Sequence, residues 1–295
     1  MSNFIILKPK KDDVDRTLFK YLVKIFDNVP ISRIEKSFRQ KDIKVNGVRN
    51  NNKQYKVQLK DEIIVYGLEN VSKPFERQDA NINFKLIYED KNLLIVDKAI
   101  NVAMHSEPNC LDNQILKYLN YKKTSSFTPA SIGRIDKKTS GLVVYAKNYK
   151  TLVEFDAKQN NFEKIYQFVS DFNEETIVKN SKSINGRINP KLEITVRLKK
   201  EVDKEKMVVD PNFGVKAKTI FWIENNKKYA QILTGKKHQI RATLEYLKTP
   251  ILGDIKYGGE RAKRLFLHSY SVKFSGLSEE FAEYNNQIFI APTKW

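Results

Sequence analysis

Residues 132–147 have the sequence Ile-Gly-Arg-Ile-Asp-Lys-Lys-Thr-Ser-Gly-Leu-Val-Val-Tyr-Ala-Lys. The one carboxylate in this stretch, Asp136, follows Arg134 by two residues and precedes a Thr-Ser-Gly turn at 139–141. Residues 142–145 are β-branched or bulky and apolar, which predicts a buried strand that opens at the turn. An acid on a tight turn at the mouth of a sheet is well placed to face a ligand, although an ordinary polar loop fits the same spacing.

The overall charge favours a polyanionic partner. The chain of 295 residues has 53 Lys plus Arg against 35 Asp plus Glu, a net charge of +18. Such an excess, spread along the whole chain, favours RNA or DNA through release of counterions from phosphates. Anionic membrane is the competing partner, but the sequence has no long apolar segment and no strongly amphipathic basic helix. A chain rich in Lys and Asn can also reflect an A+T-rich genome.

Length and cysteine content limit the possible architectures. A chain of 295 residues is long enough for two domains, one with a sizeable core. Cys110 is the one cysteine, which excludes an internal disulfide framework and agrees with a reducing compartment. The apolar run at 4–7 is too short for the core of a signal peptide, so we expect a cytoplasmic protein. A monomer is the simplest expectation.

The first seventy residues predict two short helices and a small sheet. Apolar spacing predicts a helix over 14–22, and Ser32 is a candidate cap for a second helix that runs through Ile34 and Phe38. Asn46-Gly47 is a strong hairpin signal, and residues 58–66 predict a closing strand.

This order of elements resembles the S4 RNA-binding domain over residues 13–70. The matching residues include Arg16, Leu18, Leu22, Arg39, the Ile43–Gly47 run and Asp61-Glu62-Ile63. The resemblance implies that four basic residues position RNA phosphates: Arg33, Lys36, Arg39 and Lys44. A generic helical module with a merely solvated basic face is the alternative. Residues 71–82 lack periodicity and contain a proline, which predicts a linker.

The remaining residues, 83–295, predict a larger domain with much antiparallel sheet. Strands are predicted at 84–90, 93–96, 163–169, 215–223 and 228–232, the last two joined across Asn225-Asn226, with helices near 151–155 and after Gly235. The expected fold class is therefore α+β: a small N-terminal αα-β module followed by a mixed, mainly antiparallel sheet flanked by helices.

Two stretches of this domain resemble the RluA family of RNA pseudouridine synthases, of the large-subunit ribosomal RNA type. Residues 134–143 are similar to the family's Arg-Leu-Asp-x-x-Thr-Ser-Gly-Leu-Leu motif, and residues 234–241 to its Thr-Gly-Arg-x-His-Gln-Ile-Arg run. The departures are Gly133 for the usual His, Ile135 for Leu and Lys236 for Arg. None of the three changes Asp136, which occupies the position of the family's essential aspartate.

The resemblance implies a role for each of five residues. Asp136 would be the catalytic carboxylate, acting on a flipped-out uridine either as a nucleophile or as the group that stabilises a detached sugar. Arg241 would pair with Asp136 and orient it. Tyr166 would stack on the target base, Ile240 would help to wall the pocket, and Arg134 would fill the vacated space or hold a phosphate. Without the resemblance, Tyr166 would be interpreted as a buried core aromatic.

Neither a cofactor nor a metal is expected, because the rearrangement is internal to the substrate and the three histidines (His105, His238 and His268) have no metal-ligand spacing. Lys98 resembles a lysine of the family, and a phosphate contact, a structural contact and a solvated side chain are all open for it. The rival class is a non-catalytic RNA-binding or ribosome-assembly factor that keeps the fold. A hydrolase would need a second catalytic acid, and the sequence offers no convincing one.

Overall fold

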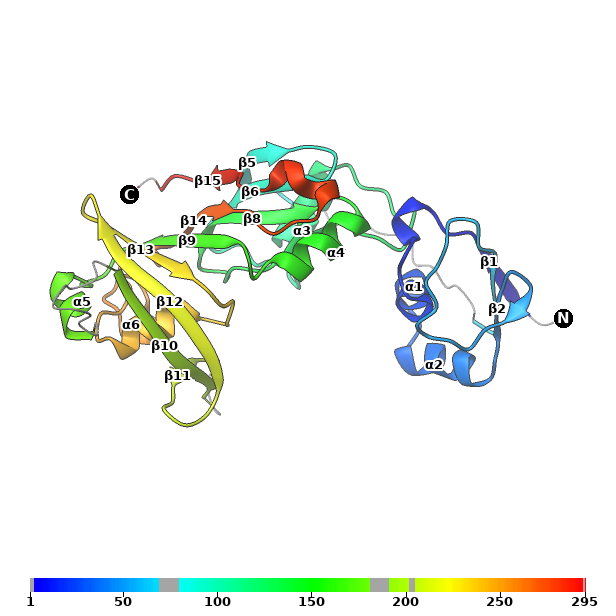
Figure 1. Cartoon of the computed structure of the whole chain (residues 1–295), viewed down its shortest axis with the longest axis horizontal. Helices are drawn as coiled ribbons and strands as arrows, with labels where there is room; N and C mark the ends of the chain where they lie inside the picture. The colour runs from blue at the N-terminus through cyan, green and yellow to red at the C-terminus, as the bar shows by residue number, and fades with distance from the viewer. Residues whose placement is uncertain (1–2, 69–79, 181–190, 202–204, 294) are drawn as a thin grey trace.

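The computed structural model describes residues 3–68, 80–180, 191–201, 205–293 and 295, and it contains two β-sheets (Figure 1). The smaller sheet has the order β1-β4-β2-β3, with β1 (Phe4–Leu7), β4 (Ile63–Tyr66), β2 (Ile43–Val45) and β3 (Val48–Arg49). The 3-10 turn η1 (Lys11–Asp13) leads into α1 (Leu18–Ile25) and α2 (Ile31–Arg39). Both helices bury apolar side chains against the sheet, among them Leu18, Leu22, Ile34 and Phe38. Strand β1 thus adds residues before position 13 to this small module.

The larger sheet has eleven strands in the order β11-β10-β12-β13-β9-β14-β8-β6-β5, with β7 beside β8 and β15 beside β14. Every neighbouring pair is antiparallel except β8 and β14, which run parallel. The predicted α+β class with a mixed, mainly antiparallel sheet is confirmed. The strand bounds are β5 (Phe84–Glu89), β6 (Leu93–Lys98), β7 (Ala130–Ile132), β8 (Ser140–Ala146), β9 (Glu163–Phe168), β10 (Lys191–Lys200), β11 (Met207–Val209), β12 (Val215–Glu224), β13 (Lys227–Ile232), β14 (Leu267–Lys273) and β15 (Ile288–Ile290).

The central strands β6 and β8 are covered on both faces. Helix α3 (Leu111–Tyr118) shares a core with one set of alternating residues, Leu94, Val96, Val143 and Tyr145. Helix α4 (Tyr149–Lys158) and the 3-10 segment η3 (Glu279–Tyr284) share a core with the other set, Leu93, Ile95, Leu142 and Val144. Burial of both faces explains why these strands are continuous apolar runs in the sequence.

The other half of the sheet is covered by α6 (Gln239–Tyr246). Its Ile240 and Leu244 pack with residues of β9, β12, β13 and β14. Helix α5 (Glu174–Asn180) contributes Ile177 to the same cluster, and the 3-10 turn η2 (Ile255–Tyr257) follows α6 in the chain. None of the helices in the described part of the chain is long and apolar enough to cross a bilayer.

Both predicted Asn hairpins are confirmed. Asn46 and Gly47 have φ values of 53° and 81° between β2 and β3, and Asn225 and Asn226 have φ values of 50° and 60° between β12 and β13. Two successive residues with positive φ make the type I′ turn, whose twist matches that of the flanking strands.

The helix starts of the small module differ from the prediction. Helix α1 begins at Leu18, four residues later than expected, because Asp15 is left-handed (φ 63°) and the Thr17 side chain accepts a hydrogen bond from the backbone N–H of Lys20. Helix α2 begins at Ile31, with Pro30 at the N-cap and no side-chain capping bond. Ser32 therefore lies inside the helix, and the prediction that it is the cap is wrong.

The small module packs against the larger domain. Buried Asp13 accepts a hydrogen bond from the backbone N–H of Ser126 at 2.7 Å, and the Arg16 guanidinium lies 3.9 Å from the ring centre of Tyr149. Asp27 adds an ion pair with Lys123. Most of the predicted linker (71–82) lies outside the described residues, so its conformation stays a prediction.

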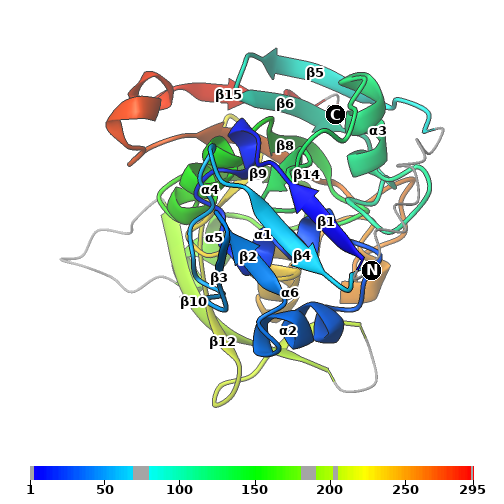
Figure 2. The ribbon, with the colours of Figure 1, turned by 90° about the vertical axis from the view of Figure 1, so that its right-hand side faces the viewer.

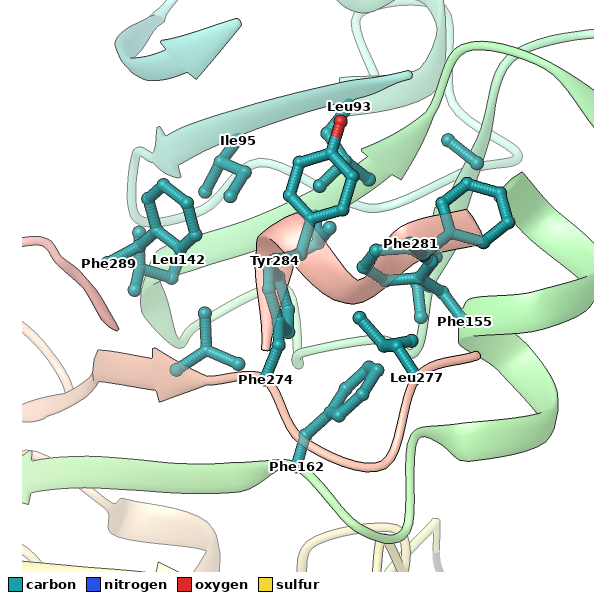
Figure 3. Close-up of a cluster of buried hydrophobic side chains, with 14 of the residues drawn as sticks. Leu93, Ile95, Leu142, Phe155, Phe162, Phe274, Leu277, Phe281, Tyr284 and Phe289 are labelled. Atoms are coloured by element: carbon teal, nitrogen blue, oxygen red, sulfur yellow. The ribbon is translucent and has the colours of Figure 1, made fainter. Parts of the chain in front are cut away.

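A cluster of aromatic rings joins α4 to the C-terminal part of the chain (Figure 3). The fully buried Phe155 lies at its centre, with ring centroids 5.2 to 5.8 Å from those of Phe162, Phe274, Phe281 and Tyr284. Edge-to-face contacts of this kind add to the free energy of burying the rings. The cluster therefore holds η3, which precedes the last strand β15, onto the face of the sheet opposite α3.

We expect Phe155→Ala to lower the free energy of unfolding by about 3–5 kcal/mol, because it leaves a cavity among four rings. Urea denaturation followed by circular dichroism measures this loss. Val153→Ala on the same helix is the control, since Val153 is 50% exposed and its truncation should change stability by no more than about 0.5 kcal/mol. Equal effects of the two substitutions would contradict the central position of Phe155.

Candidate active site

Asp136 lies on the loop between β7 and β8. Ile135 packs against two hydrophobic clusters, and it lines a cavity together with its neighbours Arg134 and Asp136. The backbone N–H of Thr139 donates to the carbonyl oxygen of Asp136 at 3.0 Å, and this turn leads directly into β8. The loop is thus anchored by one apolar side chain and one turn, and it presents the carboxylate beside the central strands.

Gly141 allows the loop to approach β14. It has a φ of 111°, and a Cβ at this position would lie 2.3 Å from the backbone oxygen of Ser269. Any other residue would force β8 and β14 apart at the start of their parallel pairing. The glycine in the Thr-Ser-Gly turn is therefore a packing requirement of the sheet next to Asp136.

The cavity has a volume of about 1140 Å³ and brings together all five predicted pocket residues: Arg134, Asp136, Tyr166, Ile240 and Arg241. They come from the β7–β8 loop, β9 and α6. Eight Lys or Arg residues line it against three Asp or Glu: Arg134, Lys137, Lys138, Lys164, Lys236, Lys237, Arg241 and Lys256 against Glu107, Asp136 and Glu205. The surplus of positive charge suits a polyanionic ligand.

Arg241 connects two carboxylates. Its Nη1 donates to Oδ2 of Asp136 at 3.1 Å, while Nε and Nη2 form a bidentate pair with Asp254 at 2.7 and 2.8 Å. Arg241 and Asp254 are buried. Burial alone would lower the pKa of Arg241, but the hydrogen bonds and charges of Asp254 and Asp136 raise it above its usual value. Asp254 thus fixes the guanidinium, and the guanidinium fixes Asp136.

The two oxygens of the Asp136 carboxylate differ in their surroundings. Oδ2 accepts the hydrogen bond from Arg241. Within the described ranges, no group donates a hydrogen bond to Oδ1. The side chain keeps 30% of its surface exposed in the cavity. One oxygen is therefore held by the protein and the other is available to a ligand.

Tyr166, on β9, lines the cavity, and the residue as a whole is 9% exposed. Burial, and then the negative charge of Asp136, raise the pKa of its hydroxyl to about 12. The phenol therefore keeps its proton at neutral pH. Near Asp136, Tyr166 offers a neutral aromatic ring of the kind on which a nucleic-acid base stacks.

Lys98 has a structural role that its sequence left open. The side chain is fully buried at the end of β6 and donates to the backbone oxygens of Ala99 (2.9 Å), Val102 (2.8 Å) and Lys137 (3.3 Å). The alternatives of a phosphate contact and of a solvated side chain are both wrong. Since Lys137 directly follows Asp136, Lys98 ties the loop that carries the carboxylate to the central strand.

Gln239, the first residue of α6, organises the loop before the helix. Its Oε1 accepts from the Thr234 hydroxyl (2.8 Å) and the Lys236 N–H (3.1 Å), and its Nε2 donates to β12 at Lys218 and Thr219. No role for this side chain, and no partner for Arg241 at Asp254, could be derived from the sequence. The one signal for Gln239 was its place inside the second motif, and for Asp254 the sequence indicated a structural or pocket-lining role without naming its partner.

The four basic residues predicted to bind RNA lie outside this cavity. Arg33, Lys36 and Arg39 are exposed on α2, where their spacing of three places them on one face. Lys44 lies on β2, half-buried, with Nζ 5.6 Å from the ring centre of Tyr66. The structure groups three of the four on one helix and leaves Lys44 on the adjoining sheet.

The family model described as RNA pseudouridylate synthase matches residues 92–246 of the chain. This range contains Asp136, Tyr166 and Arg241, together with Lys98 and the whole β7–β8 loop.

Several relatives are similar over most of their length. A protein of Mycoplasma capricolum described as an uncharacterized RNA pseudouridine synthase is 34% identical, covering 100% of this chain and 99% of the relative. A ribosomal large subunit pseudouridine synthase C of Rickettsia conorii is 30% identical over 89% of this chain and 90% of its own. A ribosomal large subunit pseudouridine synthase D of Borreliella burgdorferi is 29% identical over 77% and 72%.

A solved structure supports the fold. The human RNA pseudouridylate synthase domain containing 1 superposes with a TM-score of 0.51 and 18% identity, covering 68% of this chain and 80% of that chain.

We expect the wild type to become more stable relative to Lys98→Met as the pH rises from about 7 to about 10. Burial, opposed by the charge of Asp136, lowers the pKa of Lys98 from 10.5 to about 7. In this window the unfolded chain holds the proton of Lys98 and the folded chain has released it. Raising the pH therefore increases the free energy of unfolding of the wild type. The gain over the window is on the order of 4 kcal/mol.

Urea unfolding at several pH values across this range measures the difference between the two proteins. Lys91→Met, at an exposed position in the turn before β6, is the matched control and should follow the wild type. A difference between wild type and Lys98→Met that stays constant with pH would show that Lys98 is charged in the folded state.

Proposed function

The chain belongs to the RNA pseudouridylate synthase family, and we propose that it isomerises uridine in large-subunit ribosomal RNA with Asp136 as its catalytic carboxylate. Membership of the family makes it an enzyme, an isomerase that acts on uridine in RNA. The observation that carries the assignment of Asp136 is its geometry. One carboxylate oxygen is held by Arg241, and the other faces a basic cavity that also contains Tyr166.

The target uridine has to leave its stack to reach Asp136, because the carboxylate lies within a cavity rather than on an exposed surface. In the proposed complex Tyr166 stacks on the flipped base and Ile240 forms part of the wall. Arg134, which is exposed on the same loop as Asp136, holds the phosphate of the flipped nucleotide or fills the space that it leaves. Arg241 keeps the carboxylate oriented through the whole cycle.

The isomerisation conserves atoms and electrons. The bond between N1 of uracil and C1′ of ribose breaks, the base turns, and a bond forms between C5 and C1′. The C5 proton leaves and N1 gains one, so the proposal calls for neither a cofactor nor a metal. Asp136 serves as a nucleophile, on the base or on the sugar, or stabilises the detached sugar until it is recaptured.

Large-subunit ribosomal RNA is the proposed substrate because two relatives that match most of the chain are named as synthases for the ribosomal large subunit. The sequence-based expectations of a monomer and of a cytoplasmic location complete this proposal. A non-catalytic RNA-binding or assembly factor is the alternative, and the oriented carboxylate beside an aromatic ring argues against it, because RNA binding alone requires neither.

We propose that the N-terminal module, which resembles an S4 domain over residues 13–70, binds RNA phosphates through Arg33, Lys36, Arg39 and Lys44. In this proposal residues 83–295 form the catalytic domain and residues 71–82 the linker. The exposed basic face of α2 supports it. Contacts such as Asp13 to Ser126 give the module a defined position on the catalytic domain, so RNA held by α2 would be presented at a set distance from the cavity.

Asp136→Asn should abolish pseudouridine formation and leave RNA affinity nearly unchanged, since phosphate contacts dominate binding. The measurement is tritium release from large-subunit RNA with uridine labelled at C5, together with filter binding of the same RNA. Asp171→Asn, an exposed carboxylate outside the cavity, is the control and should turn over like the wild type. Turnover by Asp136→Asn would remove the residue from its assigned role, and release by neither protein from total cellular RNA would favour the binding-factor alternative.

The double variant Lys36→Ala/Arg39→Ala should weaken binding of long RNA and reduce the slope of log affinity against log salt by about 2, because two phosphates would each be left without a basic partner. Turnover of a saturating short substrate should stay at the wild-type rate, because the cavity is untouched. Lys20→Ala/Lys24→Ala removes two exposed lysines from α1 and serves as the matched control. An equal drop in salt dependence in both double variants would assign the effect to net charge rather than to α2.

A further inference from the structure

His238 has a constrained position beside Asp136. It directly precedes α6 with a φ of 54°, in the left-handed region that most side chains avoid. Its side chain is 9% exposed, and its two ring nitrogens face different partners. Nδ1 lies 2.8 Å from the hydroxyl of Tyr257, and Nε2 lies 3.6 Å from Oδ2 of Asp136. The proposed isomerisation steps do not use this residue.

The hydrogen bonds of Tyr257 determine which ring nitrogen of His238 carries the proton. Tyr257 is fully buried on η2, and its oxygen accepts a hydrogen bond from the backbone N–H of Met207 at 3.0 Å. If Nδ1 carried a proton and donated it to this oxygen, the buried Tyr257 proton would have no acceptor among the described residues. Every group is satisfied when Tyr257 donates its proton to Nδ1 of His238, which is then the unprotonated nitrogen. The network therefore assigns the Nε2–H tautomer to His238, and that N–H faces Asp136.

His238 and Tyr257 are both neutral near physiological pH. Burial lowers the pKa of His238 to about 4; the charge of Asp136 opposes this shift, while Arg241, Lys237 and Lys256 reinforce it. Burial likewise raises the pKa of Tyr257 to about 12. Oδ2 of Asp136 thus meets one cation, Arg241, and one neutral N–H, His238.

We propose that His238, held as its Nε2–H tautomer by Tyr257, is a positioning residue for Asp136. It faces the same oxygen that Arg241 holds, so the two donors keep Oδ2 turned toward the protein and leave Oδ1 toward the substrate. The contact at 3.6 Å is a dipole directed at a charge rather than a full hydrogen bond. This inference rests on the proposed catalytic role of Asp136.

A neutral donor suits this position better than a second cation. A protonated imidazole would add positive charge next to the carboxylate and could transfer its proton to it, and either change would weaken a nucleophile. A neutral N–H restricts rotation of the carboxylate without that penalty, and small errors of alignment at a reacting atom lower rates strongly.

Three substitutions separate the two sides of the imidazole. His238→Asn keeps a polar group as far along the side chain as Nδ1, withdraws the one that faces Asp136, and tolerates the left-handed backbone. His238→Gln does the reverse, because its amide extends as far as Nε2. Tyr257→Phe removes the hydroxyl and retains the ring that lies 4.8 Å from the Arg241 guanidinium.

For the wild type, nitrogen-15 NMR of labelled histidine should show His238 protonated at Nε2 alone, and Tyr257→Phe should show a mixture of tautomers. Tritium release should show kcat reduced on the order of tenfold in His238→Asn, with KM unchanged. This magnitude is typical when a residue that only orients a functional side chain is removed. His238→Gln should retain a higher kcat than His238→Asn, and Tyr257→Phe should lie between His238→Asn and the wild type.

Wild-type protonation at Nδ1, wild-type kcat in His238→Asn, or equal losses in His238→Asn and His238→Gln would each overturn the proposal. Failure of the proposed function gives a different result. In that case the wild type itself releases no tritium, while the tautomer of His238, which NMR reads without any substrate, remains as assigned.

Discussion

The site depends on one guanidinium that is shared by two carboxylates. Asp254 is buried and holds Arg241 through two hydrogen bonds, and Arg241 uses its remaining face to hold Oδ2 of Asp136. Without Asp254, the buried arginine would keep only the partly exposed Asp136 as its counter-charge, and breaking a buried ion pair in this way costs about 3–5 kcal/mol of stability. The same contacts that make the arginine tolerable in the core therefore fix the direction of the carboxylate that faces the cavity.

The large sheet makes this contact possible. Asp136 and Arg241 are 105 residues apart in the chain, and they meet because the loop of Asp136 ends in β8 while α6 packs on the strands beyond β14. The parallel pair β8–β14 joins these halves of the sheet, and the close approach at Gly141 sets their spacing. Packing at a strand junction thus controls the geometry of a charged pair (Figure 2 shows β8 and β14 next to each other).

The sequence predicted those features that local patterns determine. The α+β class, the two Asn hairpins and most of the strands follow from periodicity and turn chemistry. Asp136 and Arg241 stand out through their motifs, and Tyr166 is singled out only by the family resemblance. The late start of α1 was missed because it depends on a left-handed Asp15 and a cap at Thr17. The burial of Lys98 depends on which carbonyl groups surround its side-chain nitrogen in the folded chain. Hydrogen-bond partners of this kind are determined by the tertiary structure, so they cannot be predicted from residue spacing or composition.

The basic side chains of this protein fall into two groups, charged ones at the surface and buried hydrogen-bond donors at the site. Exposed lysines and arginines on α2 and around the cavity stay hydrated, so they can attract phosphates with little dependence on orientation. The buried Arg241 and the largely buried His238 have few possible arrangements, because each donor must satisfy a fixed acceptor. Affinity for RNA can therefore vary through surface substitutions while the geometry at Asp136 stays the same. RNA affinity and the geometry at Asp136 can change independently, because they depend on different residues. Arg241 and His238 are too buried to bind RNA phosphates at the surface.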